Sequence, residues 1–247
     1  MTDSQTPTVV LVHGAFADAG SFAAVTELLL ADGVKVQALA VPLRGLASDS
    51  AYVATAISQI PGPVLAVGHS YGGALITNAA ATATNVVGLV FISAFAPEEG
   101  ETLGEVEGTS RDSALAPALV QSQYPTGSGD HTAVELYVNP AAFYEVFARD
   151  LSEAQAGVLG ASQRPVAAAA FEEKSGVPAW KTLPSWAVVA AGDKAAGADV
   201  LLSMATRAGA EILQLEGSHV IMISQPRPVT DVILKALKSV TALTPVG

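Results

Sequence analysis

The sequence predicts an α/β fold, in which a mostly parallel sheet carries helices on both of its faces. Short apolar segments alternate with segments of helical periodicity, and short loops join them. The apolar segments run continuously, which is typical of parallel strands buried on both faces. One long stretch, 98–178, interrupts this alternation without a convincing core strand, so we interpret it as an inserted helical subdomain. The core is then formed by 1–97 and 179–247.

The length and composition of the chain suit one large core. Of its 247 residues, 50% are hydrophobic and 14% are charged, and the mean hydropathy is +0.42. A chain of this length buries about 70–75% of its unfolded surface on folding. No apolar run reaches the roughly 18–20 residues of a membrane span. Residues 1–7 lack the basic patch and apolar stretch of a signal peptide, so we expect a cytoplasmic protein without membrane contact.

Charge and cysteine content narrow the possible partners. The formal net charge of −11 disfavours binding to nucleic acid phosphates and to anionic lipid surfaces. The absence of cysteine excludes disulfides and thiolate metal sites, and the four histidines are scattered along the chain. We therefore expect a small-molecule partner, no nucleic acid, and neither a metal nor an organic cofactor. The oligomeric state stays open, with a homodimer among the options.

The elements of the core are predicted from periodicity and from turn residues. Before the insertion they are strand 8–12, helix 21–31, strand 34–41, helix 48–60, strand 64–68, helix 74–80 and strand 86–94. Ser48, Asp49 and Ser50 provide N-cap chemistry for the second helix, and a Pro-Gly-Pro turn ends it. Inside the insertion, 141–149 and 152–159 have helical character. The core resumes with strand 185–191, helix 198–208, strand 211–215 and helix 229–240.

A glycine-rich turn follows the third strand and contains Ser70. It reads Gly68-His69-Ser70-Tyr71-Gly72, between an apolar run and a helix-like segment. A turn this sharp strains the backbone of the serine and exposes its hydroxyl at the carboxyl end of the strand. Glycines are needed at 68 and 72 because a Cβ there would collide with the crossing strand or helix. The five-residue pattern is weak evidence by itself, and the flanking strand and helix strengthen it.

Three residues with complementary chemistry lie at the ends of predicted strands. They are Ser70, Asp193 and His219, in the chain order serine, acid, histidine. Ligands of open parallel sheets bind at the carboxyl ends of the strands, so we expect these side chains to meet there. A serine hydroxyl is a poor nucleophile until an imidazole takes its proton. A carboxylate then holds the tautomer of the imidazole and stabilises the imidazolium.

Backbone donors for a tetrahedral oxyanion are expected beside the serine. The N–H of Tyr71 lies at the start of the predicted helix, and the N–H of Ala15 follows the first strand and its His-Gly turn. Losing one such donor costs on the order of 10²–10³ in rate. Phe16 follows Ala15 directly, and we expect it to line the substrate pocket together with Phe95.

These residues resemble the serine α/β-hydrolases, in particular the compact esterase-like branch. That branch includes plant methylesterases, hydroxynitrile lyases and bacterial pyrethroid-type carboxylesterases. The matching pieces are 13–16 after the first strand, 68–73, Gly192-Asp193 and Gly217-Ser218-His219. The resemblance implies an eight-stranded family sheet, shortened here to six strands because only seven residues precede the first one. It also implies that 98–178 forms a helical cap over the active site, and we refer to 98–178 as the cap segment.

One departure from the family pattern concerns the acid. Relatives often place bulky apolar residues and a proline after it, whereas 194–197 here read Lys-Ala-Ala-Gly. Asp199 is therefore an alternative acid, and Glu98 or Glu99 a more distant one. For the other histidines, the resemblance makes His13 and His69 structural neighbours of the site. His131 is expected in a solvated loop of the cap segment.

The function expected from these residues is hydrolysis of small carboxylic esters through an acyl-serine intermediate. Activity should fall in acid as the catalytic imidazole takes up a proton. A cofactor-free perhydrolase or haloperoxidase would use the same three residues. A plant-type hydroxynitrile lyase carries a lysine after the catalytic histidine, whereas Val220 follows His219 here. A non-catalytic protein that binds a small ligand under its cap is the alternative from another class.

Overall fold

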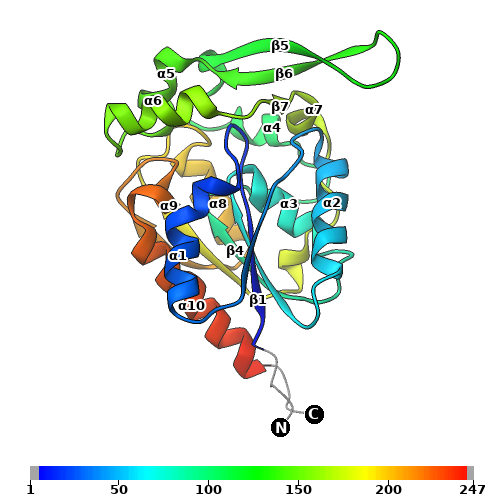
Figure 1. The fold of residues 1–247 in the computed structure, drawn as a ribbon, viewed down its shortest axis with the longest axis vertical. Helices are drawn as coiled ribbons and strands as arrows, with labels where there is room; N and C mark the ends of the chain where they lie inside the picture. Colours follow the sequence, from blue (N-terminus) through cyan, green and yellow to red (C-terminus); the bar gives the residue numbers. More distant parts are fainter. Residues whose placement is uncertain (1–5, 244–247) are drawn as a thin grey trace.

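The computed structural model describes residues 6–243, so most of the segment 1–7, on which the signal-peptide prediction rests, lies outside the described part (Figure 1). The core elements before the cap segment are β1 (Thr8–Val12), η1 (Ala19–Phe22), α1 (Ala23–Ala31), β2 (Val36–Leu39), α2 (Leu46–Ser58), β3 (Val64–His69), α3 (Tyr71–Ala79) and β4 (Val86–Ile92). Those after it are η3 (Ala179–Lys181), β8 (Ser185–Ala190), α8 (Ala198–Arg207), β9 (Glu211–Leu215), α9 (Ile221–Ser224) and α10 (Pro226–Leu243).

The core is a six-stranded parallel sheet, as the sequence predicts. Its strand order is β2-β1-β3-β4-β8-β9, and each neighbouring pair is parallel. The central strand β3 consists entirely of buried residues. Parallel pairing brings the carboxyl ends of β1, β3, β8 and β9 to the same edge of the sheet, where the predicted site residues follow each strand.

Helices cover both faces of the sheet. The α1 and α10 helices pack against each other on one face, and α2 and α3 pack together on the other (Figure 1). The first predicted helix is divided into the 3-10 turn η1 and the α-helix α1. No helix within residues 6–243 combines the length and apolarity that a bilayer span requires.

The cap segment lies across the carboxyl edge of the sheet (Figure 1). Its elements are α4 (Leu103–Glu107), η2 (Ala116–Ala118), β5 (Leu119–Pro125), β6 (Thr132–Val138), α5 (Pro140–Phe147), α6 (Glu153–Ser162), β7 (Val166–Ala167) and α7 (Ala169–Glu172). It contributes no strand to the core sheet within the described residues. The two helices expected near 141–149 and 152–159 are present as α5 and α6. The division into separate core and cap domains stays a prediction.

The expectation of a purely helical cap segment was incomplete. The strands β5, β6 and β7 form a second, antiparallel sheet, and the β5–β6 hairpin extends beyond the core (Figure 1). No residue of β5 is buried, and the strand lacks the apolar pattern that marks a core strand. The alternation of Val134, Leu136 and Val138 in β6, the last two of them buried, is a strand pattern that the sequence reasoning missed.

The predicted N-cap of the second helix was wrong. The α2 helix begins at Leu46, with Gly45 at the N-cap position, so Asp49 lies inside the first turn. Its buried carboxylate accepts hydrogen bonds from the backbone N–H groups of Arg44 and Gly45, at 3.0 and 3.4 Å. An acid in the first turn thus satisfies free donors at the start of the helix, which is the physical role that a cap residue has.

A substitution at Gly72 in α3 tests how closely the turn around Ser70 packs against β1. A Cβ at this position would overlap the backbone carbonyl of Val12 in β1, which has no freedom to move away. We expect Gly72→Ala to lower the free energy of unfolding by at least about 3 kcal/mol, measured by urea denaturation.

Gly157 in α6 is the matched control for this substitution. A Cβ there has open space around it, so Gly157→Ala should be neutral or stabilise the protein by up to about 1 kcal/mol. Equal stabilities for the two variants would contradict the close approach of α3 to β1.

Candidate active site

Ser70 occupies a strained turn between β3 and α3. Its φ of 53° and ψ of −122° are unusual for a residue with a side chain. The turn is possible because a Cβ on Gly68 would overlap the backbone of Gly72, so β3 and α3 can approach closely only with glycine there. The sequence-based interpretation of this segment as a strand, a sharp turn and a helix is confirmed.

Asp193 and His219 form a buried hydrogen-bonded pair. The Nδ1 of His219 lies 2.6 Å from Oδ2 of Asp193, and both side chains are at most 1% exposed. The other carboxylate oxygen accepts hydrogen bonds from the N–H groups of Ala195 and Ala196, each at 3.0 Å. This carboxylate is therefore fixed from both sides. The Nδ1–H of the imidazole points to the acid, which leaves Nε2 as the atom able to accept a proton.

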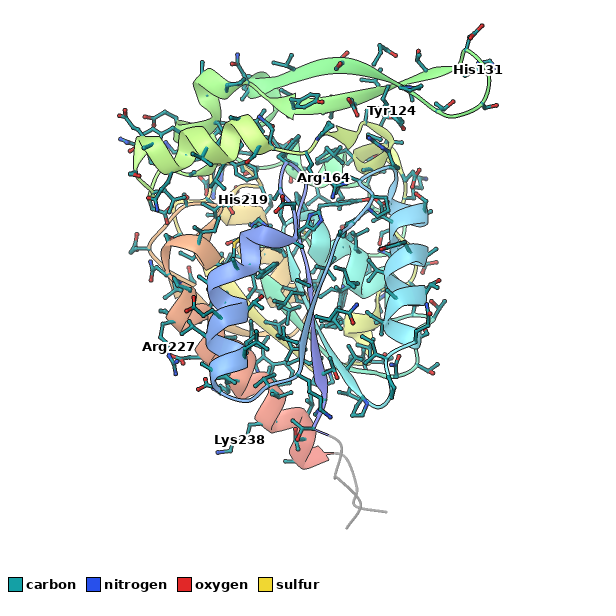
Figure 2. The ribbon with its side chains drawn as sticks, viewed as in Figure 1. Tyr124, His131, Arg164, His219, Arg227 and Lys238 are labelled. Atoms are coloured by element: carbon teal, nitrogen blue, oxygen red, sulfur yellow. The ribbon has the colours of Figure 1, made fainter. Side chains whose placement is uncertain are left out.

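Two aromatic rings hold the imidazole of His219 in place. The Phe147 ring from the cap segment lies 4.7 Å away at an interplanar angle of 70°, and the His69 ring lies at the same distance. His69 also hydrogen bonds through Nε2 to the backbone oxygen of His219, at 2.9 Å. Figure 2 shows His219 at the boundary between core and cap, far from His131 at the tip of the hairpin.

Ser70 and His219 line the same small cavity. Its other lining residues are Ala15, Phe16, Tyr71, Phe95, Leu115, Phe147, Phe171, Ala195 and Ala196. All four residues predicted to bind the oxyanion or line the pocket, Ala15, Tyr71, Phe16 and Phe95, are among them. Within residues 6–243, no hydrogen bond joins the Ser70 hydroxyl to the imidazole. Such bonds are often long or poorly aligned before substrate binds.

The two predicted oxyanion donors come from different elements. Ala15 follows β1, and Tyr71 is the first residue of α3, where helix N–H groups have no partner inside the helix. In the part of the chain that the structure describes, neither N–H donates a hydrogen bond to a protein acceptor. Both residues border the cavity that contains Ser70, so both donors are available there.

His13 and His69 support the site from within the protein. The Nδ1 of His13 lies 2.8 Å from the Gly14 oxygen, and its Nε2 accepts a hydrogen bond from Val41 N–H at 2.9 Å. These contacts fix the neutral tautomer and hold the loop that carries Ala15. Burial lowers the pKa of His13, and it lowers the pKa of His69 well below its ordinary value.

Tyr71 is anchored by Asp49, a residue that sequence reasoning did not connect with the site. Its hydroxyl donates a 2.9 Å hydrogen bond to Asp49, the buried acid in the first turn of α2. Burial raises the pKa of Asp49 and also that of Tyr71, because both groups are removed from water. The contact fixes the residue that carries one predicted oxyanion donor.

The alternative acids bind other partners. Asp199 accepts hydrogen bonds from the Ser110 hydroxyl at 2.5 Å and from Arg111 N–H at 2.9 Å. These bonds lower the pKa of Asp199 to about 2, against the opposing effect of desolvation. Glu98 pairs with Lys181 at 2.5 Å, and Glu99 contributes a backbone N–H bond to Glu98. Of the acids considered, Asp193 is the one in contact with His219.

Asp150 in the cap segment joins the loop of His219. Its carboxylate accepts hydrogen bonds from Ser218 N–H at 2.9 Å, from the Ser218 hydroxyl, and from the Ser224 hydroxyl at 2.6 Å. The Ser218 hydroxyl also lies 3.2 Å from the Phe147 oxygen. Sequence reasoning missed this contact because 68 residues separate its partners.

Comparisons with known proteins agree with this architecture. A profile described as the alpha/beta hydrolase family matches residues 9–232, so the chain belongs to this family. A search of curated proteins gave no match.

Solved structures with the same fold span almost the whole chain. Polyneuridine aldehyde esterase superposes with a TM-score of 0.78 at 20% identity, covering 94% of this chain and 99% of that one. A pyrethroid hydrolase from Sphingobium faniae gives 0.73 at 18%, covering 94% and 98%. A methylesterase from Arabidopsis gives 0.76 at 18%, covering 94% and 99%.

The buried histidines predict how stability depends on pH. Because the folded-state pKa values of His13 and His69 lie below the usual value of about 6.5, the unfolded chain binds more protons than the folded chain below that pH. The free energy of unfolding should therefore fall as the pH decreases from 7.5 to 5.5. One histidine contributes at most about 1.4 kcal/mol per pH unit to this slope, and His69, with the more strongly lowered pKa, should contribute more than His13.

Urea denaturation at several pH values measures this slope. His69→Gln should reduce it, whereas His131→Gln, at an exposed position, should leave it unchanged. An unchanged slope in the His69 variant would show that this histidine is not held neutral by burial.

Proposed function

We propose that this protein is a serine hydrolase that cleaves small carboxylic esters through an acyl-serine intermediate. The observation that supports it best is the buried 2.6 Å pair of Asp193 and His219, whose histidine lines the same cavity as the strained Ser70. The names of the similar structures, polyneuridine aldehyde esterase, a pyrethroid hydrolase and a methylesterase, are consistent with ester substrates. The partner is then a small-molecule ester. The cytoplasmic location and the homodimer stay proposals from the sequence.

In the first half of the proposed reaction, the Ser70 hydroxyl attacks the ester carbonyl. Nε2 of His219 takes the hydroxyl proton, and Asp193 stabilises the resulting imidazolium through the bond to Nδ1. The oxyanion of the tetrahedral intermediate accepts hydrogen bonds from the N–H groups of Ala15 and Tyr71. His219 then donates its proton to the leaving alcohol oxygen, and the acyl group remains on Ser70.

In the second half, water replaces the alcohol. His219 takes a proton from the water as it attacks the acyl carbonyl, and the same two N–H groups stabilise the second oxyanion. Collapse of this intermediate releases the carboxylic acid and returns the proton to Ser70. Burial of the Asp193–His219 pair keeps competing water away from the carboxylate, which strengthens their interaction.

Replacement of the serine tests the proposal directly. Ser70→Ala should lower kcat for p-nitrophenyl acetate by at least about 10³-fold and abolish covalent labelling by a fluorophosphonate probe. Ser58→Ala, at an exposed position near the end of α2, is the control and should behave as the wild type. Retention of labelling and turnover in Ser70→Ala would overturn the proposed mechanism.

The same assay separates the candidate acids. Asp193→Asn should reduce kcat by about 10⁴-fold because the amide favours the wrong imidazole tautomer. Asp199→Asn should have little effect on kcat, since Asp199 binds Ser110 and Arg111 instead. The opposite order of effects would assign the acid to Asp199.

A further inference from the structure

The cavity beside Ser70 is too small for a substrate. Its volume is about 10 Å³, which is about the space of a single water molecule. An ester whose carbonyl carbon reaches the Ser70 hydroxyl still has an acyl group and an alcohol group to accommodate. At least one of them has to occupy space outside this cavity.

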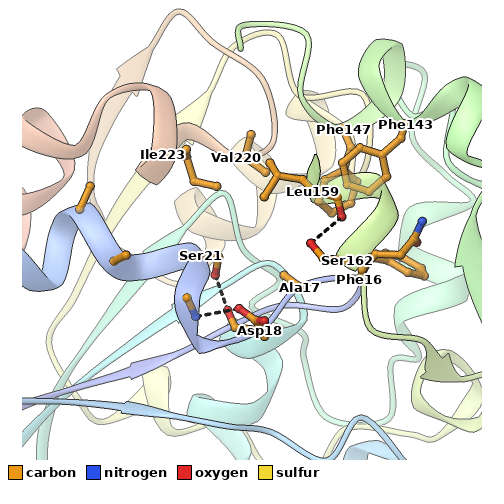
Figure 3. A pocket seen from close by; sticks show the side chains of 14 residues that line it. Phe16, Ala17, Asp18, Ser21, Phe143, Phe147, Leu159, Ser162, Val220 and Ile223 are labelled. Carbon is orange, nitrogen blue, oxygen red and sulfur yellow. Dashed lines mark hydrogen bonds between the residues drawn. The ribbon is translucent and has the colours of Figure 1, made fainter. Parts of the chain in front are cut away.

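A larger pocket lies on the other side of two phenylalanine rings. It has a volume of about 270 Å³ and lies between the η1–α1 region of the core and helices α5 and α6 of the cap segment (Figure 3). Phe16 and Phe147 line both this outer pocket and the cavity of Ser70. Their rings meet edge to face, with centroids 6.0 Å apart, and form the partition between the two spaces.

The chemistry of the outer pocket favours an uncharged, apolar group. Phe143, Phe147 and Leu159 form its cap-side wall, and Val220 and Ile223 contribute from the region after His219 (Figure 3). Such walls gain from the burial of apolar surface and offer little to a polar ligand.

The polar side chains that line the outer pocket form hydrogen bonds with other groups of the protein. Ser21 donates to the Asp18 backbone oxygen, and Ser162 donates to the Val158 oxygen. Gln163 bonds through its amide to both the N–H and the oxygen of Val138. The Asp18 side chain accepts a hydrogen bond from Gly20 N–H at 2.7 Å, and its negative charge disfavours an anionic ligand.

The position of the pocket relative to His219 decides which half of an ester it receives. In the proposed reaction, His219 donates a proton to the alcohol oxygen, so the alcohol group leaves from the side of the imidazole. The Phe147 ring meets the His219 ring edge to face, with centroids 4.7 Å apart, and Val220, another residue of the outer pocket, follows His219 in the chain. The outer pocket thus lies beside the histidine.

We propose that the outer pocket binds the alcohol group of the substrate and selects esters of bulky, uncharged apolar alcohols, aryl alcohols in particular. The inference rests on the proposed ester hydrolysis and names its substrate class. An engineered cavity of about 150 Å³ holds a benzene ring, so a pocket of about 270 Å³ has space for a fused two-ring aryl group. Rotation of the Phe147 side chain joins the pocket to the cavity of Ser70.

A pair of acetates with similar leaving groups tests this selectivity. Phenyl acetate and 2-naphthyl acetate share the acyl group and release phenols of similar acidity, so their kcat/KM ratio reports the fit of the alcohol. We expect the wild type to prefer 2-naphthyl acetate. Ala24 lines the pocket from α1, and Ala24→Phe should lower the naphthyl-to-phenyl ratio at least about tenfold.

Two further variants complete the design. Ala24→Leu fills less of the pocket and should give an intermediate ratio, which keeps the test valid if the phenylalanine variant folds poorly. Ala31→Phe places the same ring at an exposed position on the same helix and should leave the ratio unchanged. A ratio insensitive to both Ala24 variants would overturn the proposal. So would a selective loss of p-nitrophenyl butyrate relative to p-nitrophenyl acetate, because it would assign the pocket to the acyl group.

Binding of the product alcohol separates this inference from the proposed function. Ser70→Ala protein should bind 2-naphthol, measured by fluorescence titration, and Ser70→Ala with Ala24→Phe should bind it at least about tenfold more weakly. Ala24-dependent binding without any Ser70-dependent turnover would refute ester hydrolysis and leave the pocket as an aryl-binding site. Turnover that depends on Ser70, with 2-naphthol binding unaffected by Ala24→Phe, would refute the pocket assignment alone.

Discussion

The close approach of β3, α3 and β1 is the constraint on which the candidate site depends. Ser70 has a strained backbone because the chain reverses from strand to helix with no intervening loop. Strain of this kind costs about 1–3 kcal/mol and persists only where the surroundings enforce it. Here they do so, because glycine backbones at 68 and 72 pack directly against neighbouring main chain. The fold thus fixes the hydroxyl before any side chain of the site is considered.

The core and the cap segment contribute differently to the surroundings of the histidine. The core provides the hydrogen-bond partners of His219 itself: Asp193 bonds to its imidazole, and His69 bonds to its backbone oxygen. The cap segment provides Phe147 against the ring and Asp150 against the adjacent Ser218. A displacement of the cap segment would therefore disturb the same histidine that the core holds in its tautomer. Geometry at His219 depends on both parts.

The sequence was most informative where local chemistry determines structure. The glycines around Ser70 predicted the sharp turn between strand and helix. The apolar segments predicted the six strands, and with them the positions of Asp193 and His219 at strand ends. It was least informative where partners are distant in the chain. The contact of Asp49 with Tyr71 and that of Asp150 with Ser218 leave no periodic pattern, because each joins a single polar residue to another element. The β5 strand escaped prediction for a different reason, since an exposed strand carries little apolar signal.

The contacts that attach the cap segment to the core limit how a ligand can reach the small cavity of Ser70. Arg44 of the core pairs with Glu135 of β6, and Arg207 of α8 pairs with Glu101. Together with Asp150, these contacts attach the cap segment at several separate points of its border. Lifting it would break them simultaneously, although each exposed pair contributes little by itself. Rotation of the Phe147 side chain breaks none of them, although it changes the ring contacts with Phe16, Phe143 and His219. Side-chain motion is therefore the route of entry that leaves the polar contacts of the cap segment intact, including that of Asp150 with the histidine loop.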